Sequence, residues 1–184
     1  MATRARDPGA VSESMPSPPV EVRPMTEADL PRVLEIERAS FTVPWTPATF
    51  RGLLDRQDAY LRVAERAGRA GRAGDIVGYA AVWVVLDQAE LGDIAVAEEW
   101  RGHGIGARLL ASVFDLARER GVRELYLEVR VSNRGARRLY ERHGFRVVRR
   151  RTGYYARPKE DALVLRKVIE LEEQGGQGEQ GAWP

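Results

Sequence analysis

The chain contains no cysteine among its 184 residues. Disulfide bonds, thiolate metal ligands and a cysteine nucleophile are therefore excluded, and no metal site is expected. This composition is compatible with a reducing compartment, so we expect a cytoplasmic protein.

Long apolar runs are also missing. No stretch of about 18 apolar residues is present, so the sequence predicts no transmembrane helix and no membrane partner. Residues 1–19 have no apolar core of a secretory signal and are rich in Pro, Ser and Ala, so we expect a disordered leader. A second disordered segment is expected at 172–184. These assignments leave 20–171 as one folded domain.

Lysine is scarce, because only Lys159 and Lys167 occur and arginine supplies the remaining positive charge. Arginine suits bidentate contacts with phosphate and carboxylate, although a codon bias gives the same excess. The formal net charge is only +2. That value argues against a general nucleic-acid binder, so no direct nucleic-acid partner is expected. No feature of the sequence predicts an oligomeric state.

The order of apolar patterns and turn residues predicts an α/β (α+β) fold, with a mixed sheet of about seven strands flanked by helices. Helices are expected after Thr26, where Asp29 completes a capping box, after Thr46-Pro47, over 104–120 and over 133–143. Strands are expected at 20–23, 60–65, 76–86, 90–96, 125–131, 145–151 and 162–169. The Gly/Arg repeat at 67–74 indicates an expanded hairpin loop.

A glycine-rich turn joins the strand ending at Val96 to the helix at 104–120. It reads Arg101-Gly-His-Gly-Ile-Gly-Ala-Arg108. A strand, a glycine turn and a helix N-terminus direct free N–H groups and the helix dipole at one point, which suits a phosphate. Arg101 and Arg108 can add charge-assisted bonds. A plain tight turn has the same pattern, so the loop alone only indicates a phosphate site.

Two known phosphate motifs differ from this loop. A Walker loop requires Gly-Lys-Ser/Thr at its end, whereas Gly106 is followed by Ala107-Arg108. A dinucleotide fingerprint requires an acid about twenty residues further on, at the end of the next strand. Glu128 lies near that distance but within the strand, so this alternative stays open.

The strand at 125–131 alternates, so Glu128 leaves the apolar face and looks to the other side of the sheet. It either enters a cleft or forms a surface ion pair with an arginine. Asn133 caps the next helix, on which Tyr140 and His143 share an apolar stripe. Tyr140 is therefore either a half-buried core residue or a cleft residue, and His143 is structural.

Together these motifs resemble the GNAT (Gcn5-related) N-acetyltransferases over about residues 20–170. The matching pieces are Ile94-Ala-Val96, Arg101-x-x-Gly104-x-Gly106-Ala107, Leu127-Glu-Val-Arg130 with Asn133, and Ala136-x-x-Leu139-Tyr140-Glu-x-x-Gly144-Phe145. Within this superfamily the chain is similar to the bacterial ribosomal-protein-alanine N-acetyltransferases. That similarity rests on Phe41, Pro44-Trp45, Phe50, Leu127-Glu-Val-Arg130, Tyr154-Tyr155 and Glu160-Asp161-Ala162.

The resemblance implies that acetyl-CoA is the donor and that the acceptor is the N-terminal amine, on alanine, of a ribosomal protein. It implies that Glu128 is the general base and Tyr140 the general acid. The main-chain groups of Ile94, Ala95 and Val96 would contact the pantetheine arm of the cofactor. The pyrophosphate cradle would be Arg101, Gly102, His103, Gly104, Ile105, Gly106 and Ala107, with Asn133 as a further cofactor contact. The peptide groove would be lined by Phe41, Trp45, Tyr154 and Tyr155.

An α-amino group has a pKa of about 7.7–8.0, so most of it is protonated at neutral pH and needs a proton acceptor before it can attack. Without cysteine, direct transfer in a ternary complex is expected. Three alternatives remain: a GNAT enzyme that acetylates lysine or a small-molecule amine, a non-enzymatic acyl-CoA sensor or ribosome-binding module, and a nucleotide-binding protein.

Overall fold

The computed structural model describes residues 19–68 and 74–171. The leader expected at 1–19, apart from Pro19, and the tail expected at 172–184 lie outside the described residues. Within the described ranges, no helix is both long enough and apolar enough to cross a membrane.

Seven strands form one mixed sheet in the order β1-β2-β3-β4-β5-β7-β6. Neighbouring strands are antiparallel, except that β4 and β5 run parallel. The expected mixed α/β sheet is thereby confirmed. The strands are β1 Val20–Pro24, β2 Ala59–Arg66, β3 Asp75–Val85, β4 Gln88–Val96, β5 Glu124–Arg130, β6 Arg146–Ala156 and β7 Lys159–Val168.

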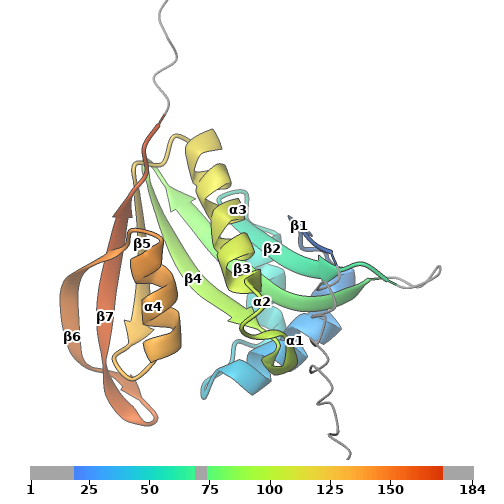
Figure 1. Cartoon of the computed structure of the whole chain (residues 1–184), viewed down its shortest axis with the longest axis horizontal. Coiled ribbons are helices and arrows are strands. Elements are labelled where there is room, and N and C mark those ends of the chain that lie inside the picture. The colour runs from blue at the N-terminus through green and yellow to red at the C-terminus, as the bar shows by residue number, and fades with distance from the viewer. Residues whose placement is uncertain (1–18, 69–73, 172–184) are drawn as a thin grey trace, which may run out of the picture.

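Helices cover both faces of the sheet (Figure 1). They are α1 Leu30–Ser40, α2 Pro47–Leu54, α3 Ile105–Glu119 and α4 Arg134–Arg142. Residues of α3 and α4 share one hydrophobic cluster, and residues of α1 and α2 share a second cluster on the opposite face. The sheet therefore separates two cores, and any opening in it connects the two faces.

The helix boundaries follow the local signals in the sequence. The Thr26 amide donates to Asp29 Oδ2 at 2.8 Å, and a 3-10 turn at Glu27–Asp29 precedes α1. At the start of α2, Thr46 Oγ1 accepts from the Thr49 amide at 3.2 Å. Gly121 ends α3 with a φ of +68°, as expected for a glycine after a helix.

The expanded hairpin is confirmed at its base, because β2 and β3 are antiparallel and Arg66 pairs with Asp75. Residues 69–73 of its loop lie outside the described residues. β6 is longer than expected: the sequence predicted an end at Arg151, but the strand continues to Ala156, and its residues alternate in exposure only from Gly153 onward. Contacts with β7 extend it, since the Gly153 amide donates to Asp161 Oδ1 at 2.7 Å.

A buried carboxylate ties α1 to the sheet. Glu37 is fully buried, and it accepts hydrogen bonds from the Tyr79 hydroxyl of β3 and from the Trp45 amide at 2.6 Å. Burial raises the pKa of Glu37, and the two donors oppose that shift. These bonds fix the segment between α1 and α2 against β3.

Tyr79→Phe removes one of the two donors to Glu37 and keeps the ring in the core. A buried acceptor that loses its partner costs about 1–3 kcal/mol, so we expect a lower Tm and a lower midpoint in urea. Tyr60→Phe is the matched control, because Tyr60 is half-buried and its hydroxyl has no hydrogen-bond partner within the described ranges. Equal losses of stability in the two variants would contradict the expectation.

Candidate active site

The strands β4 and β5 part in the middle of the sheet. They pair only from Gln88 opposite Glu124 to Leu91 opposite Leu127. Beyond that point β4 continues to Val96 and β5 to Arg130 with no ladder between them. Figure 1 shows the two strands diverging, with α3 and α4 on the near side of the gap. The parting creates an opening through the sheet.

Gly92 lies where the parting begins. The register of β4 on β3 shifts at this point, because Ala81 pairs with Asp93 whereas Val82 pairs with Leu91. Such a bulge bends a strand. A Cβ on Gly92 would lie 2.3 Å from ring carbons of Trp83, so glycine allows this close approach and a larger residue would displace the ring.

The backbone of β4 supplies polar groups to the opening. The Ala97 amide donates to the Val77 carbonyl at 2.9 Å. Because an antiparallel ladder alternates, Ala95 bonds to β3 while Ile94 and Val96 turn their peptide groups toward the opening. The Val96 carbonyl accepts from Arg101 Nε at 3.1 Å. Ile94 and Val96 therefore turn main-chain groups toward the opening, whereas Ala95 contributes a buried side chain.

The glycine loop presents an array of backbone donors. Gly102 and Gly104 have φ values of +81° and +76°, which favour glycine. The first helical bond of α3 runs from the Arg108 amide to the Gly104 carbonyl at 3.1 Å. Across the described ranges, no protein acceptor is bonded to the amides from Gly102 to Ala107. Such amides at a helix N-terminus form an anion site.

The side chains of this loop point elsewhere. Arg101 also reaches Ser40 Oγ at 3.4 Å, and Arg108 donates to the Val20 carbonyl at 2.9 Å. His103 lies against the loop itself, with Nδ1 3.0 Å from the Arg101 carbonyl, and its ring is 5.7 Å from that of Trp100. Within the described ranges, the backbone amides of the loop are therefore free to bond an anion, whereas the two guanidinium groups are bonded elsewhere in the protein.

A cleft of about 630 Å³ lies at the parted strands, which is a size typical of small-ligand sites. It gathers residues from both faces of the sheet and from five separate segments of the chain. Of the residues that the sequence singled out, the cleft is lined by Phe41, Trp45, Ile94, Glu128, Asn133, Tyr140, Tyr154 and Tyr155. The loop at 101–107 lies outside the cleft, at the start of α3.

Glu128 combines both interpretations given by the sequence. It lines the cleft, and it also accepts from the guanidinium of Arg151 on β6. The Arg151 guanidinium lies 4.1 Å from the ring centre of Tyr154. The Glu128 side chain keeps 19% of its surface exposed, so a ligand in the cleft can reach part of it.

Tyr140 is buried on α4, with its ring edge against Phe145 at 5.6 Å between ring centres. Burial raises the pKa of its hydroxyl, and the nearby charge of Asp93 raises it further. The hydroxyl therefore stays protonated at neutral pH, as a proton donor must. Asn133 caps α4 by accepting from the Ala136 amide at 3.1 Å and lines the cleft, and its amide nitrogen donates no hydrogen bond to another described residue.

Four aromatic residues stand at the mouth of the cleft. Tyr154 and Tyr155 pack edge to face at 5.1 Å between ring centres. Burial raises the pKa of Tyr155 to about 12. Trp45 packs on Phe50 at 5.5 Å and also lines the cleft with Phe41. Trp45 is therefore both a core residue and a wall of the cleft.

Asp93 is a cleft residue that the sequence analysis did not single out. Burial raises the pKa of its carboxyl to about 8, and the charge of Glu37 adds to the shift. The sequence feature that could have identified Asp93 is the position of an acid directly before the apolar run Ile94-Ala-Val96. Its burial depends on the bulge at Gly92 and on packing against α1, which the sequence pattern does not reveal.

The fold and this cleft define a class of proteins. The family model of the acetyltransferase (GNAT) family matches residues 30–145. The chain therefore belongs to the GNAT family, and it is an acetyltransferase whose donor is acetyl-CoA.

Particular relatives share most of the chain. A protein of Bacillus subtilis named a putative [ribosomal protein bS18]-alanine N-acetyltransferase is 39% identical over 78% of this chain and 92% of its own length. The [ribosomal protein bS18]-alanine N-acetyltransferase of Escherichia coli is 34% identical over 78% of this chain and 93% of its own length. The crystal structure of the ribosomal-protein-S18-alanine N-acetyltransferase from Escherichia coli superposes with a TM-score of 0.73 at 30% identity. That superposition covers 85% of this chain and 97% of the other.

Asp93→Asn tests the buried acid through the pH dependence of stability. Because the folded pKa of Asp93 is raised to about 8, the folded state keeps a proton that the unfolded chain releases near its usual pKa of about 3.9. The stability that depends on this proton is present at low pH and is lost as the pH rises toward 8. Asparagine is neutral at every pH, so we expect the variant to melt a few degrees above wild type at about pH 8.

Thermal melts between about pH 4 and pH 8 provide the measurement, and the difference in Tm between variant and wild type should shrink toward the acid end. Asp55→Asn is the control, because Asp55 is exposed at the end of α2. A difference for Asp93→Asn that stays constant across the range would contradict the raised pKa.

Proposed function

We propose that this chain transfers the acetyl group of acetyl-CoA to the N-terminal amine of a ribosomal protein that begins with alanine. The observation that carries the proposal is the parted β4–β5 pair, where Glu128, Tyr140 and Ile94 meet in one cleft and β4 has no ladder partner beyond Leu91. The relatives named for alanine N-acetylation of ribosomal protein bS18 support this acceptor. Ribosomal proteins are made in the cytoplasm, so we assign the reaction to that compartment.

The described residues fit acetyl-CoA. The free amides from Gly102 to Ala107 suit its pyrophosphate, and the peptide groups of Ile94 and Val96 suit the amide groups of its pantetheine arm. Asn133 offers its amide nitrogen from the head of α4. When bound, acetyl-CoA supplies a thioester whose acetyl carbon is open to attack by an amine.

Two side chains move protons in this proposal. Glu128 accepts a proton from the acceptor ammonium, directly or through a water molecule, so that the neutral amine can attack. An amide N–H of the β4 backbone near Val96 can stabilise negative charge on the carbonyl oxygen. Tyr140 gives its hydroxyl proton to the leaving sulfur. Holding both reactants in one cleft adds the advantage of proximity.

The aromatic residues at the mouth of the cleft suit an acceptor that is the N-terminus of a polypeptide. Phe41 and Trp45 come from the segment after α1, and Tyr154 and Tyr155 come from β6 on the other side. An extended N-terminus can lie between these two walls with its amine directed at Glu128. A lysine or a small-molecule amine is the alternative acceptor, and it has no comparable need for a walled groove.

Glu128→Gln and Tyr140→Phe test the two proton-transfer roles. Each removes a group whose contribution is typically about 10²–10⁴-fold, so we expect kcat to fall by a factor in that range. Affinity for acetyl-CoA, measured by calorimetry, should stay within a few-fold because neither group belongs to the pyrophosphate loop. Arg134→Gln is the control, since Arg134 is exposed at the start of α4. Full activity of both active-site variants would refute the assigned roles.

The acceptor is tested by mass spectrometry of protein N-termini from cells that lack this chain. We expect one ribosomal protein that begins with alanine to lose its acetyl group, and a plasmid copy of the gene to restore it. Purified enzyme should acetylate a peptide with that N-terminus. Transfer to an aminoglycoside or to a lysine side chain, with none to peptides that begin with alanine, would instead establish the alternative.

A further inference from the structure

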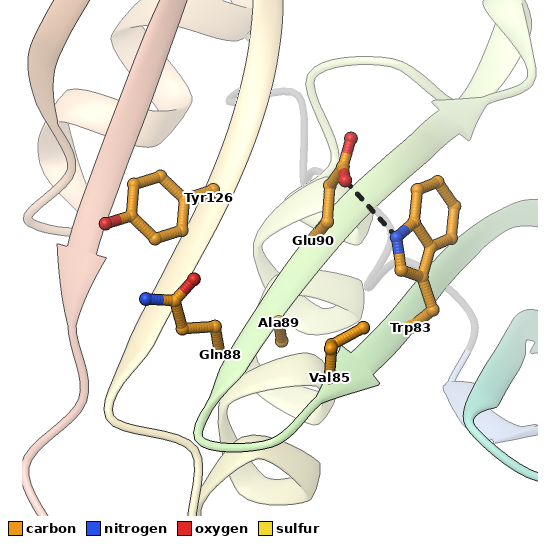
Figure 2. Close-up of a pocket in the computed structure, with 6 residues that line it drawn as sticks. All are labelled: Trp83, Val85, Gln88, Ala89, Glu90 and Tyr126. Carbon is orange, nitrogen blue, oxygen red and sulfur yellow. Dashed lines mark hydrogen bonds between the residues drawn. The ribbon is translucent and has the colours of Figure 1, made fainter.

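A second pocket, of about 350 Å³, adjoins the cleft and shares Trp83 and Glu90 with it. Its other lining residues come from the closed end of the sheet, where β4 and β5 are still paired: Val85, Gln88, Ala89 and Tyr126. Figure 2 shows the pocket opening toward the viewer, with α3 behind the strands. The pocket therefore continues the cleft along the face opposite α3.

The register of the sheet explains its composition. Trp83 pairs with Glu90 across β3 and β4, and Glu90 pairs with Tyr126 across β4 and β5. Cross-strand partners share a face of the sheet, so the carboxylate stands between two aromatic rings, as Figure 2 shows. The Trp83 indole N–H donates to Glu90 Oε2 at 3.2 Å, which orients the carboxylate in the pocket.

Glu90 differs from Glu124 and Glu128, the other acids on this face, because it has no salt-bridge partner among the described residues. Glu124 is paired with Arg166 at 2.9 Å, and Glu128 is paired with Arg151. No salt bridge among the described residues includes Glu90, and its side chain is exposed. The pocket thus combines two aromatic surfaces with a carboxylate that forms no direct ion pair within the described ranges, although the charge of Arg151 acts on it from a distance.

We propose that this pocket binds a basic side chain of the acceptor polypeptide, downstream of the residue whose amine is acetylated. The inference rests on the proposed peptide acceptor. A guanidinium or ammonium group is the partner that this chemistry favours, because it can bond to the Glu90 carboxylate and stack on the rings of Trp83 and Tyr126.

The spacing of the strand indicates which acceptor residue reaches the pocket. Tyr126 precedes Glu128 by two residues on β5, which corresponds to about 7 Å along the strand. An extended acceptor chain covers that length in about two residues. With its amine beside Glu128, its third or fourth residue therefore lies over Glu90.

The experiment uses synthetic peptides that begin with alanine and carry Arg, Gln or Glu at position 3 or 4. For the wild-type chain we expect kcat/KM to be about tenfold higher with Arg than with Glu at the favoured position, mainly through KM. Glu90→Gln should remove most of this preference, and Glu90→Arg should reverse it. The ratio between peptides is the readout, so a general loss of activity does not imitate the effect.

Glu119→Gln is the matched control, because Glu119 is exposed at the far end of α3, and it should keep the wild-type ratio. Circular dichroism establishes that each variant is folded. Normal acetylation with an Arg-to-Glu ratio unchanged by both Glu90 variants would overturn the pocket assignment alone. No acetylation of any peptide that begins with alanine would overturn the proposed function, and the pocket assignment with it.

Discussion

The parting of β4 and β5 after Leu91 is the constraint on which the rest of the site depends. Within a continuous ladder, the peptide groups of Ile94 and Val96 would be bonded to β5 and unavailable to any ligand. The bulge at Gly92 bends β4 where the pairing stops, and the opening then joins the two hydrophobic layers that the sheet separates elsewhere. One local irregularity in one strand thus makes a through-sheet site possible.

The acids around the opening are held in different ways, and this difference separates their functions. Glu37 is sealed in the core by Tyr79 and the Trp45 amide, so it supports the architecture. Asp93 lies between the core and the cleft, and burial favours its neutral form. Glu128 faces the cleft with Arg151 beside it. The position of each acid, from the sealed core to the wall of the cleft, therefore decides which of them a ligand can reach.

The sequence predicted the features that depend on local chemistry. The glycines of the loop, the cap at Asn133 and the alternation that turns Glu128 away from the core are all short-range signals, and the structure has each of them. Features that depend on register or tertiary packing were not predicted. The position of Asp93 depends on a bulge in β4. The aromatic neighbours of Glu90 result from pairing across three strands, and the end of β6 is extended by its pairing with β7. The roles of the site residues themselves remain predictions.

The contact between Gly92 and Trp83 has an evolutionary consequence. Ring carbons of Trp83 occupy the place that a side chain at position 92 would need, and Trp45 stands 3.0 Å from the same place. A substitution at position 92 therefore requires the Trp83 ring to move or to be exchanged for a smaller residue, and either change alters one wall of the pocket at Glu90. The two positions are epistatic, as expected for residues in direct contact. A lineage that changes what it recognises through Trp83 also changes which residues its bulge can tolerate.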